Sequence, residues 1–142
     1  MQPGWFYILG PGTTTRAIAI RLGFPKTLVG VDVYTREGVV ALDVSEARLL
    51  ELIENQPAKI IVTPIGGQGC IFGRGNQPIS PDVIRKVGRA HVRVVSTREK
   101  LEALNGAPLW ADTGDGEVDE VLSGYFAVIV GYKESVMYKV SA

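Results

Sequence analysis

The sequence predicts an α/β fold in which one mostly parallel sheet is flanked by helices in a Rossmann-like, three-layer arrangement. Two observations lead to this prediction. Apolar, β-branched stretches alternate with short stretches of helical spacing along most of the chain, which is typical of consecutive βαβ units. The last two apolar stretches, residues 125–130 and 136–140, are separated by only five residues and predict a closing antiparallel hairpin. A chain of 142 residues is long enough for one domain, so we expect residues 1–142 to form a single domain.

The first half of the chain supplies four of the expected strands and two helices. Strands are predicted at residues 5–9, 27–34, 39–42 and 58–62 from their runs of branched and aromatic side chains. A short helix over residues 17–22 is ended by Gly23 and Pro25, and a second helix begins after Ser45, which we expect to be its N-cap.

The second half continues the alternation. Ser80 and Pro81 have the spacing of an N-cap and a first helical residue, and Gly88 ends that helix. Residues 91–95 and 108–111 are predicted strands. Between them, Ser96 and Glu99 have the spacing of a capping box. Residues 118–122 predict a further helical turn before the hairpin.

Composition excludes several classes of protein. Fifteen basic residues balance fifteen acidic ones, which argues against a nucleic-acid-binding surface. The single cysteine excludes an internal disulfide, and no apolar run approaches the length of a membrane span. The first residues lack the pattern of a signal peptide. We therefore expect a cytoplasmic protein without a membrane partner, and its net charge of zero favours a homo-oligomer.

The first polar loop, residues 10–16, has the pattern of a phosphate site. Glycines allow a ligand to approach the backbone, hydroxyl groups donate hydrogen bonds, and a helix N-terminus favours negative charge. No Gly-Lys-Ser/Thr follows, so the loop is not a Walker motif. The alternative is that a threonine simply caps the helix. The candidate ligand-binding residues here are Gly10, Gly12, Thr13, Thr14, Thr15 and Arg16.

The second polar loop, residues 63–77, is the most unusual stretch of the chain. Five of its fifteen residues are glycines, and it also carries amide side chains and one arginine. Glycine forfeits packing, so this composition suits a long loop close to a polar ligand. Arg74 stands between two glycines and could grip phosphate oxygens, the alternative being a solvated side chain. The candidates here are Gly66, Gly67, Gln68, Gly69, Arg74, Gly75, Asn76 and Gln77.

A third polar turn, residues 112–116, follows another predicted strand. Asp112, Thr113 and Asp115 are candidate ligand-binding residues, and the two carboxylates could hold Mg²⁺ beside phosphates. The alternative is that the two carboxylates stabilise a turn or cap a helix. If the preceding strands are parallel, all three polar loops lie at the same sheet edge, where such folds bind their ligands.

Three other residues have side chains that could take part in chemistry. Asp32 lies within an apolar run and could serve either a site or a turn. His91, the only histidine, has no carboxylate or nucleophile near it in sequence, so we expect a structural role. Cys70 lacks a nearby base to activate it as a nucleophile.

Four stretches carry a family resemblance: GPGTTTRAIA, VTPIGGQGCIFGRGNQPISPDVIRKVG, ADTGD and GYFAVIVGYKESVMYKV. Together they resemble the C-terminal half of ATP-NAD kinase-like proteins, in the branch related to the acetoin-catabolism X protein. The resemblance implies nucleotide binding, with NAD or ATP as the ligand. The candidates of all three loops fall on the family's motifs, whereas Cys70 stands where a bulky aromatic is usual.

The sequence departs from the family in lacking the Gly-Gly-Asp-Gly-Thr motif of the N-terminal kinase domain. We therefore expect no phosphoryl transfer by this chain alone and a separate N-terminal kinase-like chain as a partner. One alternative is a ligand-sensing or oligomer-forming module with contacts at Ile71 and Phe72. Another is an enzyme like the sugar-phosphate isomerases, whose phosphate loops the GPGTTT turn resembles, with Asp32, Asp112 or Asp115 as the acid–base group.

Overall fold

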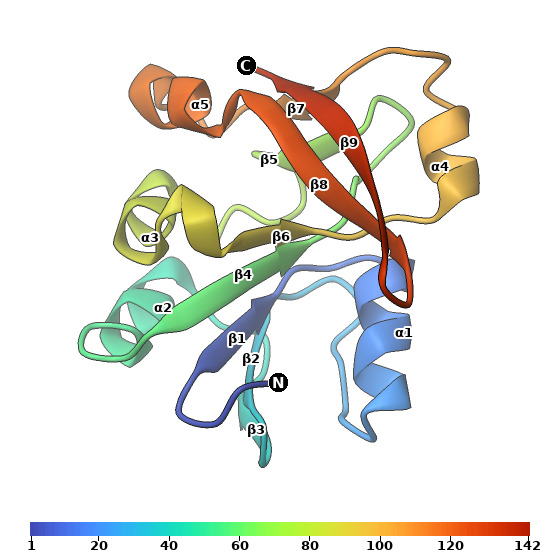
Figure 1. Cartoon of the computed structure of the whole chain (residues 1–142). Helices are drawn as coiled ribbons and strands as arrows, with labels where there is room; N and C mark the ends of the chain where they lie inside the picture. The colour runs from blue at the N-terminus through green and yellow to red at the C-terminus, as the bar shows by residue number, and fades with distance from the viewer.

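A computed structural model describes all 142 residues as nine strands, five α-helices and one 3₁₀ turn. Figure 1 shows their arrangement. The strands are β1 (Phe6–Leu9), β2 (Asp32–Thr35), β3 (Gly38–Ala41), β4 (Ala58–Val62), β5 (Cys70–Phe72), β6 (Val92–Val94), β7 (Leu109–Ala111), β8 (Gly124–Gly131) and β9 (Glu134–Ser141). The helices are α1 (Thr13–Arg21), α2 (Glu46–Leu52), α3 (Pro81–Val87), η1 (Arg89–His91), α4 (Arg98–Glu102) and α5 (Gly116–Leu122).

The strands form two sheets, where the sequence led us to expect one. Sheet A has the order β3-β2-β1-β4-β6, and sheet B has the order β5-β7-β9-β8. In sheet A, β1 pairs in parallel with β4 and β4 with β6, whereas β1–β2 and β2–β3 are antiparallel. Sheet A is therefore mixed, because β2 alone runs opposite to its neighbours β1 and β3.

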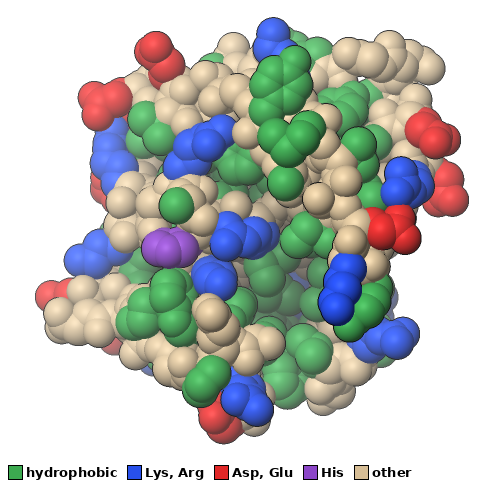
Figure 2. Space-filling model, viewed as in Figure 1, with side chains coloured by type: hydrophobic (Ala, Val, Ile, Leu, Met, Phe, Trp, Pro, Cys, Tyr) green, Lys and Arg blue, Asp and Glu red, His purple; other side chains and the backbone are tan.

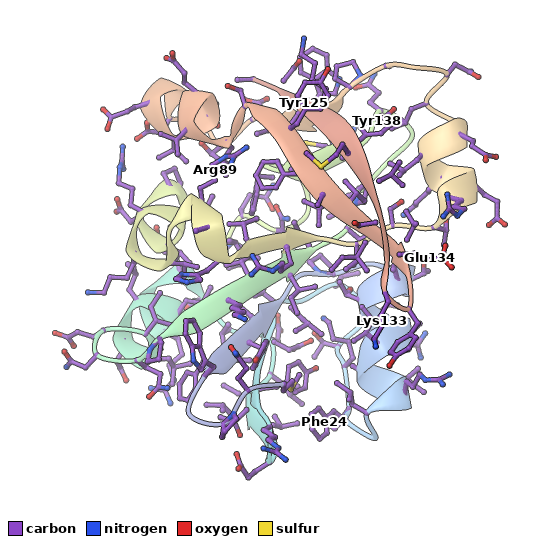
Figure 3. All side chains as sticks on the ribbon, in the orientation of Figure 1. Phe24, Arg89, Tyr125, Lys133, Glu134 and Tyr138 are labelled. Carbon is purple, nitrogen blue, oxygen red and sulfur yellow. The ribbon has the colours of Figure 1, made fainter.

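Sheet B joins sheet A at the end of β6. Strands β5, β7 and β9 are parallel, and β8 pairs antiparallel with β9 over nearly its whole length. Val95, just after β6, forms a parallel bridge with Ile129 of β8. At the other end of these two strands, Arg89, just before β6, donates to the carbonyl of Tyr125 at the start of β8, and its guanidinium carbon lies 4.2 Å from the ring centroid of Phe126. Figure 3 labels Arg89 and Tyr125. The predicted C-terminal hairpin is confirmed.

The helices lie on both faces of sheet A, which confirms the predicted α/β class with flanking helices (Figure 1). Alternate strand residues separate two cores. Ile8 belongs to a cluster of 25 buried residues shared with α2, α3, α5 and sheet B. Its neighbours Tyr7 and Leu9 face α1, where Ala19 and Tyr34 complete a smaller cluster. This alternation follows from the two-residue repeat of a strand.

The second face of sheet A is covered by α1 only in part. A groove of about 580 Å³ runs between α1, the sheet and the end of β8, and its ten lining residues include Lys59 and Arg93 but no acid. Figure 2 shows hydrophobic and basic side chains around a hollow on this face, with acidic side chains near the outline. None of the helices is long and apolar enough to cross a membrane.

Local details confirm some of the predicted helix starts and correct one. Ser45 and Ser80 cap α2 and α3 by accepting from Arg48 and Val83, and Pro81 is the first residue of α3. The predicted capping box at Ser96 is wrong, because Thr97 caps α4 and the buried Ser96 hydroxyl donates to the carbonyl of Thr97. The polar loops and caps thus emerge from a scaffold of short, well-packed elements.

Candidate functional site

The first two polar loops leave sheet A side by side. Strands β1 and β4 are parallel neighbours, with Leu9 paired to Ile61, so residues 10–16 and 63–77 start at the same edge. The amide of Gly10 donates to the carbonyl of Ile61 at 3.0 Å. A Cβ on Gly12 would lie 2.4 Å from Cγ2 of Thr63. Gly12 therefore lets the two loops touch, which is a packing reason for glycine at this position.

Helix α1 differs from the other four α-helices at its start. Ser45, Ser80, Thr97 and Asp115 cap α2 to α5 with a side-chain oxygen, but the N-cap of α1 is Gly12, at φ 130°, without a side-chain hydrogen bond. The alternative that a threonine caps this helix is therefore wrong. The amides of residues 13–15 have no backbone acceptor, so the first turn of α1 keeps its donors available.

The three threonines of this loop are not equivalent. Thr15 is fully buried, and its hydroxyl donates to the carbonyls of Gly10 and Gly12 at 2.7 and 3.1 Å. Thr14 is half-buried and Thr13 is exposed. Thr15 therefore holds the turn together through its hydrogen bonds. Of the three threonines, only Thr13 lines the cavity at the start of α1.

A cavity of about 310 Å³ lies at the start of α1. Arg16 and the helix start line one side, and Ile65 and Gly75 of the glycine loop line another. The apolar Leu28 and Val29, which are 68% and 78% exposed, complete it. The full lining is Pro11, Gly12, Thr13, Arg16, Leu28, Val29, Ile65 and Gly75.

The glycine loop is an ordered hairpin-like turn. Ile65 and Cys70 exchange backbone hydrogen bonds of 2.7 and 3.2 Å, and residues 66–69 form the tip. Gly69 is buried, and a Cβ there would meet Leu104 and Leu109 at 3.1 and 3.2 Å. Gly73 touches the chain more closely still, because its Cβ would lie 1.6 Å from the carbonyl oxygen of Asp112. Close backbone approach thus explains both glycines.

Other parts of this loop are open. Gly66, Gly67, Gln68, Gly73, Arg74 and Gly75 have no backbone acceptor for their amides. All six residues are exposed. The loop therefore presents a run of backbone donors, the arrangement that binds anions in backbone nests.

Arg74 runs alongside this open backbone. A Cβ on Gly66 would lie 3.5 Å from Nη1 of Arg74, and Arg74 forms no salt bridge within the protein. Its side chain lines a second cavity of about 460 Å³. The lining consists of Gln68, Cys70, Gly73, Arg74, Trp110, Ala111, Asp112 and Ala142.

The two amides at the end of the loop have different surroundings. Asn76 is fully buried, and its Nδ2 donates to the carbonyl of Ile71 at 2.8 Å, while its Oδ1 has no partner. Gln77 is exposed and lines neither cavity. The structure thus places Asn76 as a brace of the loop, with its side chain away from solvent.

The third polar turn meets the glycine loop because β5, within that loop, pairs in parallel with β7 in sheet B. The amide of Asp112 donates to the carbonyl of Phe72 at 3.1 Å, which places the exposed Asp112 in the second cavity with Arg74. Thr113 instead donates from its amide and hydroxyl to the buried Asp119, at 2.9 and 2.6 Å. Sheet B thus delivers the third loop, which corrects the expectation that one sheet edge gathers all three.

Asp115 does not join Asp112 at a metal site. Its Oδ1 accepts from the amides of Glu117 and Val118, and Oδ2 accepts from Arg85 at 2.7 Å. These donors, the Val118 amide first, lower the pKa of Asp115 below its usual value. The structure gathers no group of three or more histidine, cysteine or acidic side chains that could hold a metal. The alternative that Asp115 caps a helix therefore accounts for its position, and we do not assign a Mg²⁺ site to it.

Asp32 has a structural role that its sequence position left open. It is fully buried and paired with Lys26, whose side chain is also buried. It accepts in addition from the amide and hydroxyl of Thr27 and from the amide of Asp43. This cluster pins residues 26–31 as a loop, so the strand predicted over 27–34 begins only at Asp32.

His91 and Cys70 carry no visible chemistry. Nδ1 of His91 lies 3.1 Å from the carbonyl of Val87, and the ring meets Trp5 edge-on at 5.1 Å. The Cys70 thiol lies 3.0 Å from the carbonyl of Phe72. Burial raises the pKa of that thiol, so the reactive thiolate is disfavoured.

Sequence reasoning missed the three large apolar side chains from outside the polar loops that line these cavities. Trp110 was assigned only to a strand, and Leu28 and Val29 to another. The alternation of buried Leu109, exposed Trp110 and buried Ala111 was a signal that the indole points away from the core. The exposure of Leu28 and Val29 had no such signal, because it depends on the buried carboxylate of Asp32.

The sequence of this chain matches the family model of the ATP-NAD kinase C-terminal domain over residues 5–140. The chain belongs to the ATP-NAD kinase C-terminal domain family. No curated protein and no solved structure matches it. The match confirms the resemblance that the glycine loop, the GPGTTT turn and the hairpin indicated.

For an ATP-NAD kinase C-terminal domain, the structure divides the candidate residues into two groups. Some hold the loops in place, chiefly the buried threonine and asparagine, the glycines at close contacts and the capping aspartate. Others face a cavity and are available to a ligand. The second group consists of Thr13, Arg16 and Gly75 in the first cavity and Gln68, Arg74 and Asp112 in the second.

Proposed function

We propose that this ATP-NAD kinase C-terminal domain binds a phosphorylated small molecule, and foremost a nucleotide such as NAD or ATP, along residues 63–77. The observation that carries the proposal is the position of Arg74, whose guanidinium lies beside Gly66 in a stretch of open backbone amides. A guanidinium and several N–H donors on one concave surface are suited to phosphate oxygens.

The two cavities beside the loop support a ligand larger than phosphate. One lies at the start of α1 with Arg16, and the other holds Gln68, Arg74 and Asp112. Their volumes of about 310 and 460 Å³ fall in the range of small-molecule sites. The start of α1 adds about half a positive charge to its cavity. A nucleotide placed on the glycine loop can therefore reach polar groups on either side of it.

The proposed role is binding without phosphoryl transfer by this chain alone. Of the three acids that could serve acid–base chemistry, Asp32 is buried in an ion pair and Asp115 caps a helix. Asp112 is therefore the one acid of the three that is free for such a role. The Gly-Gly-Asp-Gly-Thr motif of the kinase domain is not in the sequence. We propose that catalysis needs a kinase-like domain from a partner chain.

The structure weighs against the alternatives. An oligomer contact through Ile71 and Phe72 would need these side chains at the surface, but both are fully buried. An isomerase would need an acid–base group beside a phosphate site. Asp112 is the single acid that lines either cavity, so it is the one acidic side chain there for this role. Neither alternative is favoured by a specific contact.

Calorimetric titration with ATP and NAD tests the proposal. Arg74→Ala removes a charged hydrogen-bond donor, so affinity should fall by about 1.5–3 kcal/mol, or roughly 10- to 150-fold. Arg36→Ala is the matched control, because Arg36 lies in the exposed β2–β3 turn at the opposite end of β2 from Asp32. Absence of binding by the wild-type protein, or equal affinity in both variants, would refute the proposal.

A further inference from the structure

We propose that Trp110 stacks against the base of the bound nucleotide, so that the site selects base-bearing ligands over simple sugar phosphates. This inference rests on the proposed function and assigns a role to a residue outside the three polar loops. The ligand class is inferred from the second cavity, which is lined by the aromatic Trp110, the cationic Arg74 and the polar side chains of Gln68 and Asp112.

The strand presents Trp110 as an outward platform. Leu109 and Ala111, on either side, are 0% and 1% exposed, whereas Trp110 is 41% exposed. Its backbone is fixed, because the Trp110 amide donates to the carbonyl of Gly69 at 3.0 Å and β7 is paired on both edges. The indole is therefore held in place at the surface by the strand that carries it.

The indole of Trp110 makes no aromatic or cation–π contact within the protein. The two aromatic pairs are Trp5 with His91 and Phe24 with Tyr34, and the three cation–π contacts involve Trp5, Phe126 and Tyr132. Trp110 takes part in none of them. A large, partly exposed aromatic side chain that lines a cavity is the kind of surface on which nucleobases stack.

The remaining lining matches the polar parts of a nucleotide. Arg74 supplies a positive charge for a phosphate, and Gln68 offers both a donor and an acceptor. The carboxylate of Asp112 is an acceptor for an amino group or a hydroxyl. A sugar phosphate would use Arg74 in the same way but would bring no aromatic ring to Trp110. The two ligand classes therefore differ in what the indole contributes.

The chain contains two tryptophans, which allows a direct optical test. Trp5→Phe leaves Trp110 as the single indole, and Trp110→Phe leaves Trp5, whose ring lies against His91. After correction for nucleotide absorption, saturating ATP should quench the fluorescence of Trp5→Phe along the calorimetric binding curve. It should leave that of Trp110→Phe unchanged. Inorganic triphosphate and ribose 5-phosphate should quench neither variant.

Affinity provides the second measurement. Trp110→Leu should weaken ATP binding about tenfold or more, the size of a lost stacking contact, and should leave the affinity for inorganic triphosphate unchanged. Trp110→Phe keeps an aromatic ring and should therefore retain most of the ATP affinity. A purely structural role of Trp110 in β7 does not predict this difference in ATP affinity between the Phe and Leu variants. A thermal melt of each variant monitors the fold.

The outcomes separate this inference from the proposed function. If ATP and triphosphate bind equally, depend on Arg74 and ignore Trp110→Leu, the stacking role is overturned while phosphate binding stands. If ribose 5-phosphate binds as tightly as ATP and quenches Trp110, the selection for a base is overturned. If none of the three ligands binds the wild-type protein, both proposals fail.

Discussion

Replacing Lys26 by methionine tests the view that a buried ion pair shapes one wall of the first cavity. Lys26 and Asp32 are both buried and paired, and Lys26 also donates to the carbonyls of Gly30 and Thr27 at 2.8 and 3.1 Å. Methionine keeps the length and apolar stem of the side chain but removes its charge. The variant therefore leaves the carboxylate of Asp32 buried without its counter-ion.

The expected loss follows from the partners that remain. Removing one member of a buried pair typically costs about 3–5 kcal/mol. Asp32 would still accept from Thr27 and from the amide of Asp43, at 2.7 Å, so we expect a value near the lower end, about 3 kcal/mol. For a chain of this size that corresponds to a fall in Tm of roughly 6–12 °C.

Urea denaturation followed by circular dichroism measures this change. Arg48→Met is the matched control, because the Arg48–Glu51 pair is 49% and 69% exposed and should contribute less than about 1 kcal/mol. Since residues 26–31 carry Leu28 and Val29, the Lys26→Met variant should also bind ATP more weakly. A loss of stability no larger than that of the control would refute the reasoning, because the pair would then not behave as buried.

Three further predictions follow from the loops. Gly73→Ala places a Cβ against the carbonyl of Asp112 and should lower the midpoint of urea unfolding, whereas Gly67→Ala, with open space around it, should not. Asn76→Ala should cost about 1–3 kcal/mol of stability in the same assay, because the buried carbonyl it serves loses its donor. Asp115 has a lowered pKa in the folded state, so its contribution is present at neutral pH and is lost as the pH falls below about 4. Between pH 6 and 3 the wild-type Tm should therefore drop further than that of Asp115→Asn, and equal drops would contradict this assignment.

Local patterns predicted the elements well where short-range chemistry decides them. Ser45 and Ser80 cap helices where their spacing indicated, and the hairpin of β8 and β9 forms as expected. The prediction at Ser96 failed by one residue because Thr97, a neighbour with the same kind of hydroxyl, is the one that caps α4. A choice between adjacent hydroxyls depends on the direction in which the chain leaves β6, which a spacing rule does not contain.

The sequence pattern predicted where the polar loops lie but not what each of their residues does. Glycine content marked residues 63–77, and the structure leaves many of its amides open while placing Arg74 in a cavity. The pattern did not separate the residues that line the cavities from those that hold the loops in place. Thr15 and Asn76 turn inward to bond the loop backbone, because each can reach a nearby carbonyl that would otherwise be buried unpaired.

By itself the sequence determined the α/β class, the order of most elements, the glycine-rich loop and the family to which the chain belongs, because these depend on residue type and spacing. Tertiary structure alone decided that the strands divide into two sheets, and that β5 of the glycine loop pairs with β7 in sheet B. This pairing brings Arg74, Trp110 and Asp112 to one cavity. The physical reason is that each of these depends on pairing between strands far apart in the chain. Only the whole packed core, shared by both sheets, selects one such pairing among many.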